Sequence, residues 1–217
     1  MSSELHLIIG NKAYSSWSMR PWLALKDKGL SFQETVIHLY GPDAKSRILE
    51  FSLAGKVPVL RHGEITVWDS LAILDYLADT FPTLAWWPVD PRARAYARAV
   101  SAEMHAGFSH VRAQMPMNVR RDLAGKDRGE SVKGDILRIT EIWRNCREKF
   151  SSGGPFLFGS FSNADAMYAP VVTRFKTYGV ELDATCKAYS DAILGHPAMK
   201  EWYAAAATEQ WVVDKFE

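Results

Sequence analysis

Hydrophobic and polar positions follow one pattern in the first 82 residues of the chain and another pattern in the rest. In the first part, short runs rich in Leu, Ile and Val predict strands, and the amphipathic segments between them predict helices. The predicted strands are 5–9, 32–39, 57–60 and 65–67, and the predicted helices are 17–28 and 70–81. The strand–helix–strand order followed by a hairpin and a helix predicts a mixed sheet with helices on its faces.

After residue 91 the apolar residues recur at steps of three and four, which predicts helices only. These segments are 92–115, 131–150, 164–177, 185–193 and 197–207. The stretch between the two parts contains two prolines and no clear period, so it predicts a linker. We therefore predict a thioredoxin-like α/β domain over residues 1–82, a linker over 83–91 and an all-helical domain over 92–217.

The composition excludes several classes of function. Lys plus Arg total 26 and Asp plus Glu total 25, a net charge of +1 that gives no reason to expect nucleic acid or an anionic membrane as partner. Residues 1–4 lack a leader pattern, and the apolar runs are shorter than the ~20 residues of a membrane span. Two cysteines exclude a disulfide scaffold, so we expect a protein of the reducing cytoplasm. Six histidines without ligand spacing predict no metal site.

The loop after the first predicted strand contains Ser15-Ser16-Trp17-Ser18 at the start of a predicted helix. A hydroxyl cannot exchange disulfides, so this loop excludes dithiol redox chemistry. Hydroxyls beside a helix N-terminus favour an anion, including a thiolate that a ligand supplies. The alternative is that these serines are ordinary N-cap residues.

Two further segments point to a ligand. In the first, a proline follows Val57 at the start of a predicted strand, and a cis Val57–Pro58 bond would leave the backbone of Val57 open to a peptide ligand. The alternative is a trans proline on an edge strand. In the second, Asp69 and Ser70 precede a helix, where they would hold the ammonium and carboxylate of an amino acid or simply cap the helix. A sulfur site, a peptide site and an amino-acid site together match the parts of glutathione.

These residues resemble the glutathione transferase superfamily, and the resemblance covers nearly the whole chain. The loop 15–20 is similar to the serine loop of the zeta and theta classes, 56–60 to the cis-proline motif and 69–73 to the acidic-Ser motif. The segment 161–165 resembles the N-capping box of the family's second domain, a structural feature.

The resemblance implies roles for particular residues. Ser15 would donate a hydrogen bond to the thiolate, with Ser16 as the alternative. The residues implied to bind glutathione are Lys45, Lys56, Val57, Pro58, Asp69 and Ser70. The implied wall of the hydrophobic substrate pocket is formed by Tyr14, Trp17, Met104, His105 and Phe108, although the spacing of Met104 and Phe108 also fits core packing.

The resemblance further implies a homodimeric glutathione transferase that activates glutathione, its co-substrate, as a thiolate for addition to a small hydrophobic electrophile. Two alternatives remain open. One is a glutathione-dependent isomerase of the maleylacetoacetate type, and the other is a binding protein that keeps the fold without catalysis. Ser15, Val57-Pro58 and Asp69-Ser70 argue against the last alternative, because a protein that does not bind glutathione would not need them.

Overall fold

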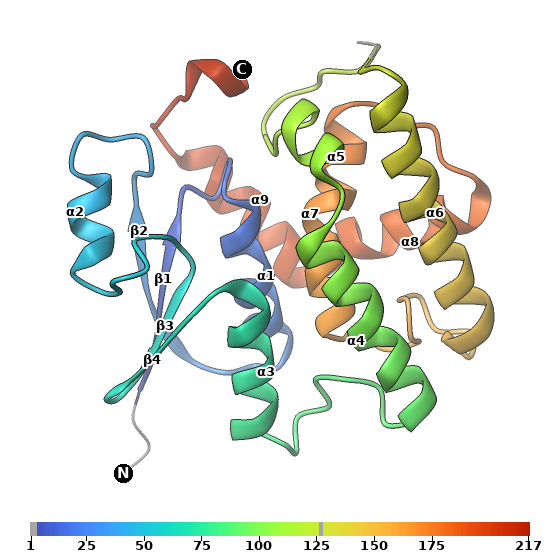
Figure 1. Cartoon of the computed structure of the whole chain (residues 1–217), viewed down its shortest axis with the longest axis horizontal. Helices are drawn as coiled ribbons and strands as arrows, with labels where there is room; N and C mark the ends of the chain where they lie inside the picture. Colours follow the sequence, from blue (N-terminus) through green and yellow to red (C-terminus); the bar gives the residue numbers. More distant parts are fainter. Residues whose placement is uncertain (1–3, 126–127) are drawn as a thin grey trace.

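A computed structural model of the chain describes residues 4–125 and 128–217. Residues 1–3, on which the expected lack of a leader partly rests, lie outside the described residues. A four-stranded mixed sheet with three helices comes first in the chain, and a group of helices follows it, as Figure 1 shows. The predicted fold class is therefore confirmed, while the limits of the two domains and the linker stay a prediction.

The sheet contains β1 (Leu5–Gly10), β2 (Phe32–Ile37), β3 (Val59–His62) and β4 (Ile65–Trp68) in the order β2-β1-β3-β4. β1 and β2 are parallel because a helix connects them, whereas the other two pairs are antiparallel. β3 and β4 form the predicted hairpin, and Gly63 at its turn has a φ of 60°. β4 is thus left at one edge of the sheet.

Helices cover both faces of the sheet (Figure 1). Alternate residues of β1 point to opposite faces, so Leu7 packs with α1 (Ser16–Asp27) and α3 (Ser70–Thr80), whereas Ile8 packs with α2 (Ala44–Leu49). α2 has no counterpart among the helices predicted from the sequence. With six residues, that helix is too short to show a clear hydrophobic period.

The helical part contains α4–α9 and a short 3-10 helix. Their bounds are α4 Pro91–Ala106, α5 Ser109–Gln114, α6 Glu130–Phe150, α7 Asn163–Thr177, α8 Ala184–Gly195, α9 Pro197–Thr208 and η1 Asp214–Phe216. The single helix predicted over 92–115 is wrong, because Gly107 and Phe108 interrupt it between α4 and α5. The φ of Phe108 is 59°, which is not a helical value. α4 and α5 contribute to the same core, so the apolar period continues through the break and conceals it.

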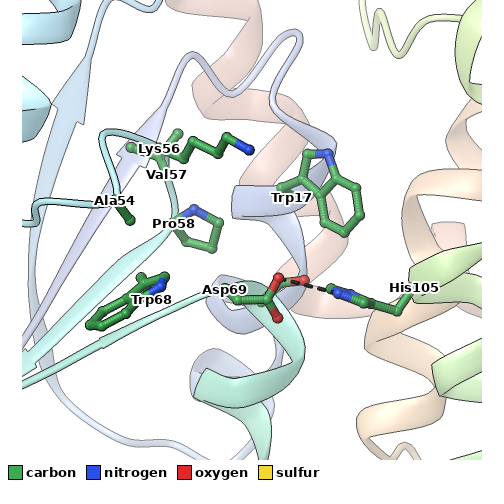
Figure 2. A pocket seen from close by; sticks show the side chains of 9 residues that line it. Trp17, Ala54, Lys56, Val57, Pro58, Trp68, Asp69 and His105 are labelled. Carbon is green, nitrogen blue, oxygen red and sulfur yellow. Dashed lines mark ion pairs between the residues drawn. The ribbon is translucent and has the colours of Figure 1, made fainter.

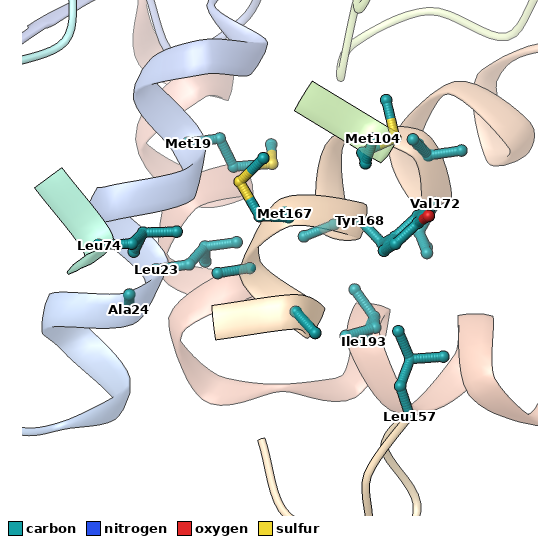
Figure 3. Close-up of a cluster of buried hydrophobic side chains, with 14 of the residues drawn as sticks. Met19, Leu23, Ala24, Leu74, Met104, Leu157, Met167, Tyr168, Val172 and Ile193 are labelled. Carbon is teal, nitrogen blue, oxygen red and sulfur yellow. The ribbon is translucent and has the colours of Figure 1, made fainter. Parts of the chain in front are cut away.

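α7 is buried along almost its whole length, and Figure 3 shows its Met167, Tyr168 and Val172 among the buried side chains of the core. At its start the Ser162 N–H donates to Asp165 Oδ2 at 2.9 Å, so the predicted capping box is confirmed. α7 packs against both α1 and α4, and one apolar core joins the sheet side to the helical part. None of the helices in the described part of the chain combines the length and the hydrophobicity that a membrane-spanning helix needs.

Candidate active site

Two neighbouring cavities lie where the N-terminal sheet and α1 meet the helical part. The first cavity, of about 580 Å3, is lined by Trp17, Ala54, Lys56, Val57, Pro58, Trp68, Asp69, Ser70 and His105. The second cavity, of about 400 Å3, is lined by Tyr14, Ser15, Ser16, Trp17, Leu39, Tyr40, Val57, Arg112, Ala113, Pro116, Met117, Arg174 and Phe216. Trp17 and Val57 line both cavities, so a ligand bound beside these two residues would adjoin both cavities.

The first cavity brings together residues from four separate segments of the chain, one of which contributes Trp17 of α1 (Figure 2). The Val57–Pro58 peptide bond is cis, and Val57 precedes the first paired residue of β3, Val59. Asp69 and Ser70 enter the cavity at the start of α3, while His105 comes from α4. The cavity therefore places a backbone segment next to a helix N-terminus and a carboxylate.

Asp69 is held in an unusual conformation, with a φ of 76° and its side chain capping α3. Its Oδ1 accepts from the Leu71 N–H at 2.9 Å and the Ala72 N–H at 3.3 Å. Its Oδ2 lies 3.2 Å from His105 Nε2, as the dashed line in Figure 2 shows. A non-glycine residue with positive φ at a ligand cavity is typical of a functional site that its surroundings hold in place.

Ser15 and Ser16 line the second cavity and make different hydrogen bonds. The Ser15 hydroxyl donates to Ser18 Oγ at 2.7 Å, and Ser18 Oγ in turn accepts from the Gly10 N–H at 3.1 Å. Ser16 Oγ accepts from Arg174 Nη2 at 3.2 Å. Both serines are nearly buried, with exposed fractions of 6% and 5%. The second cavity thus presents hydroxyls at the start of α1.

Arginine side chains gather around Trp17 and the serines. The guanidinium carbons of Arg20 and Arg112 lie 4.2 and 4.6 Å from the Trp17 ring centroid, within cation–π range. Arg20 also donates to Ser70 Oγ at 3.4 Å. Burial and then the charges of Arg112 and Arg174 lower the pKa of Arg20. Burial and then the charge of Arg112 lower the pKa of Arg174. Of these arginines, Arg112 and Arg174 line the second cavity, whereas Arg20 lines neither cavity.

Three residues predicted for the site lie elsewhere. Met104 is fully buried in the core (Figure 3), and Phe108 is buried at the start of α5, so neither lines the two cavities. Core packing, the alternative for this pair, is what the structure shows. Lys45 lies on α2, where its Nζ donates to the Gly55 carbonyl at 3.4 Å, and it lines neither cavity.

Several residues that line the second cavity carry no functional signal in the sequence. Arg174 lies inside α7, and Phe216 lies in η1 near the end of the chain. No local pattern marks either residue, because the separation between Arg174 and Ser16 is 158 residues along the chain. Arg112 lies in a segment predicted only as a helical continuation, and it donates to the Gly107 carbonyl at 2.9 Å and to the Met104 carbonyl at the end of α4.

Family models match both parts of the chain. The glutathione S-transferase N-terminal domain matches residues 14–80, and the glutathione S-transferase C-terminal domain matches residues 101–205. The chain belongs to the glutathione S-transferase family. This glutathione S-transferase family member is 40% identical to glutathione S-transferase 1 of Dianthus caryophyllus over 175 residues, which is 77% of each chain.

Two further relatives extend the comparison. The maleylacetoacetate isomerase of Pseudomonas aeruginosa is 28% identical over 199 residues, covering 88% of this glutathione S-transferase family member and 92% of the relative. Among solved structures, a glutathione transferase homolog from Burkholderia with bound glutathione superimposes with a TM-score of 0.74 at 23% identity. The match covers 95% of this chain and 100% of that one, which shows a shared fold.

Proposed function

We propose that this protein is a glutathione transferase that binds glutathione in the first cavity and an electrophile in the second. The observation that carries the proposal is the junction of the two cavities at Trp17 and Val57, next to Ser15 and Ser16. A thiol at this junction would face the serines on one side and a second substrate on the other. The family relatives named glutathione S-transferase support the same assignment.

Glutathione would be held along its whole length. The Val57 backbone pairs with the cysteinyl part, Asp69 and Ser70 hold the γ-glutamyl head, and Lys56 attracts the glycyl carboxylate. Asp69 has one oxygen occupied by the α3 N–H groups and the other beside His105, so its carboxylate is already oriented. Orientation of this kind lowers the entropic cost of the reaction.

The serine hydroxyl, we propose, donates a hydrogen bond to the sulfur and lowers the pKa of the thiol from about 8.5, so that more thiolate forms at neutral pH. The proton leaves to solvent. The thiolate then forms a carbon–sulfur bond with the electrophile while a leaving group departs with the bonding electrons. The residues of the chain bind, orient and stabilise charge, and they form no covalent bond to substrate.

Two lysines provide a matched test of glutathione binding. Lys56 lines the first cavity, whereas Lys45 bonds to Gly55 and lines neither cavity. We expect wild-type protein and Lys45→Ala to be retained on immobilised glutathione and to turn over an aromatic halide. Lys56→Ala should raise the KM for glutathione several-fold. A wild-type protein that does not bind glutathione would overturn the proposal and would favour the non-catalytic binding protein.

A second candidate function is a glutathione-dependent isomerase acting on a substrate with a carboxylate. Arg112 and Arg174 line the second cavity, and the buried Arg112 Nη1 has no hydrogen-bond partner among the described residues. The thiolate would add to a cis double bond, the single bond of the adduct would rotate, and elimination would return the thiolate and the trans isomer. The relatives named maleylacetoacetate isomerase fit this alternative.

A substrate comparison separates the two functions. Turnover of maleylacetoacetate far above turnover of an aromatic halide would favour the isomerase. Arg112→Met should then lower kcat/KM for the charged substrate and leave the neutral halide unaffected. Equal losses with both substrates would show that Arg112 does not select for charge.

We also propose that the protein acts as a cytoplasmic homodimer. β4 is one edge of the sheet, and its Ile65 and Trp68 are 50% and 55% exposed on opposite faces of that strand, so a second copy that packs along this edge would cover both. Ile65→Lys should shift sedimentation toward the monomer, whereas Leu137→Lys on α6, which is 66% exposed, serves as the control. Both cysteines are free thiols, as a reducing compartment would keep them.

A further inference from the structure

The loop that carries Ser15 is held by residues that lie almost two hundred positions away in the chain. The Lys12 N–H donates to Glu209 Oε1 at 2.6 Å, and the Ala13 N–H donates to Glu209 Oε2 at 3.0 Å. One carboxylate, located just after α9, thus accepts two consecutive backbone N–H groups of the loop between β1 and α1. Hydrogen bonds to a carboxylate are stronger than those between neutral groups.

The carbonyl groups of the same two residues are also bonded to the helical part. Trp202 Nε1 on α9 donates to the Lys12 carbonyl at 2.9 Å, and the Val119 N–H donates to the Ala13 carbonyl at 3.1 Å. Lys12 and Ala13 are buried, with exposed fractions of 8% and 0%. Buried backbone groups need partners. The position of this loop therefore depends on the helical part rather than on the sheet alone.

Glu209 is itself fixed in place. Its carbonyl accepts from Arg120 Nη1 at 2.9 Å, and its N–H donates to the Ala206 carbonyl at 3.3 Å. Arg120 Nη2 also donates to the hydroxyl of Tyr14 at 2.5 Å, and Tyr14 directly precedes Ser15 in the sequence. The Ser15 N–H donates to the Asn11 carbonyl at 2.8 Å. This hydrogen bond closes a turn that contains Lys12 and Ala13, so the residues bound by Glu209 are part of the turn that ends at Ser15.

We propose that Glu209 is a positioning residue, whose carboxylate fixes the Lys12–Ala13 backbone so that the Ser15 hydroxyl meets the sulfur. The inference rests on the proposed function, since it needs a thiolate at Ser15. Without the carboxylate, two buried N–H groups lose their acceptors and the loop shifts to find others. Misplacement of a catalytic group by about 1 Å can cost about a hundredfold in rate.

The test compares Glu209→Ala and Glu209→Gln with a matched control, Glu201→Gln. Glu201 is also a carboxylate on the C-terminal side, and it pairs with Lys26 of α1 at 2.6 Å without touching the loop. The readouts are the pH dependence of kcat/KM with glutathione and an aromatic halide, and amide hydrogen exchange of the loop. Glu209→Gln keeps one acceptor oxygen, so it stays informative if the alanine variant folds poorly.

We expect Glu209→Ala to shift the apparent pKa of the bound thiol upward by about one unit, which lowers kcat/KM at neutral pH about tenfold. Glu209→Gln should lie between this variant and the wild type, and Glu201→Gln should match the wild type. Faster exchange in residues 11–16 should accompany the shift. If the wild type binds glutathione but Glu209→Ala shows an unshifted pH profile or unchanged hydrogen exchange, the role of Glu209 is overturned and the proposed function stands. A wild type that does not bind glutathione would overturn the proposed function and this role together.

Discussion

Replacement of Ser15 by Ala tests the proposed sulfur site directly. A hydrogen bond to a charged group contributes about 1.5–3 kcal/mol, whereas one between neutral groups contributes about 0.5–1.5 kcal/mol. Ser15 already donates to Ser18 Oγ at 2.7 Å, so donating to sulfur exchanges one hydrogen bond for a stronger one. The net preference for the thiolate is therefore about 1–1.5 kcal/mol, or about one pKa unit of the thiol. We expect Ser15→Ala to raise that pKa by about one unit and to lower kcat/KM at neutral pH about tenfold.

Ser16→Ala is the matched comparison, because it also removes one serine hydroxyl, from the residue next to Ser15. Ser16 Oγ accepts from Arg174 Nη2 at 3.2 Å, and Arg174 is buried with an exposed fraction of 4%. Loss of this acceptor leaves a buried donor without its partner, which costs about 1–3 kcal/mol of stability. We therefore expect Ser16→Ala to lower the thermal unfolding midpoint while the thiol pKa stays close to that of the wild type.

The assay titrates bound glutathione by the ultraviolet absorbance of its thiolate, at saturating glutathione, and measures thermal unfolding of each variant in parallel. A thiol pKa that moves in Ser16→Ala and not in Ser15→Ala would refute the assignment and make Ser16 the donor. If neither variant moves it, the thiolate is held by backbone N–H groups at the start of α1, and the magnitude derived for a hydroxyl does not apply.

Three further outcomes follow from burial and charge. Phe216→Ala should raise the KM for the electrophile several-fold with little change for glutathione, because Phe216 lines only the second cavity; equal changes in both KM values, measured by steady-state kinetics, would contradict this. The native protein should not react with a disulfide reagent, because both cysteines are buried and burial raises the pKa of Cys146 and of Cys186 to about 12. Two thiols should react after unfolding. Rapid reaction of the folded protein would show that the cysteines are not buried. Burial raises the pKa of Asp165 from 3.8 to about 6, so its folded form binds the proton more tightly than the unfolded chain, and stability is lost as pH rises from about 4 through 6. Denaturant unfolding should show wild type losing about 3 kcal/mol relative to Asp165→Asn across that window, and parallel pH curves would show that Asp165 titrates normally.

Much of the fold could be predicted because local patterns are explicit in this chain. The strands show apolar runs, and helices such as α3 and α6 show a period that burial of one face requires. The capping box at α7 is equally local, since Ser162 and Asp165 are three residues apart. The break at Gly107 and the short helix α2 were missed because neither changes the hydrophobic period over a long enough segment.

By itself the sequence determined short motifs that contain Lys56, Val57, Pro58, Asp69 and Ser70, five residues that line the first cavity, because these motifs stand just before a strand or at the start of a helix. Only the tertiary structure decided that Arg112, Arg174 and Phe216 join the predicted serines in the second cavity, and that Glu209 supports the serine loop. Arg174 contacts Ser16, and Glu209 contacts the Lys12–Ala13 backbone, across more than 150 residues of chain. Phe216, near the end of the chain, lines the same cavity as Ser15 and Ser16. Such contacts depend on how α7 and the C-terminal segment pack against α1, and packing of distant elements leaves no local spacing in the sequence.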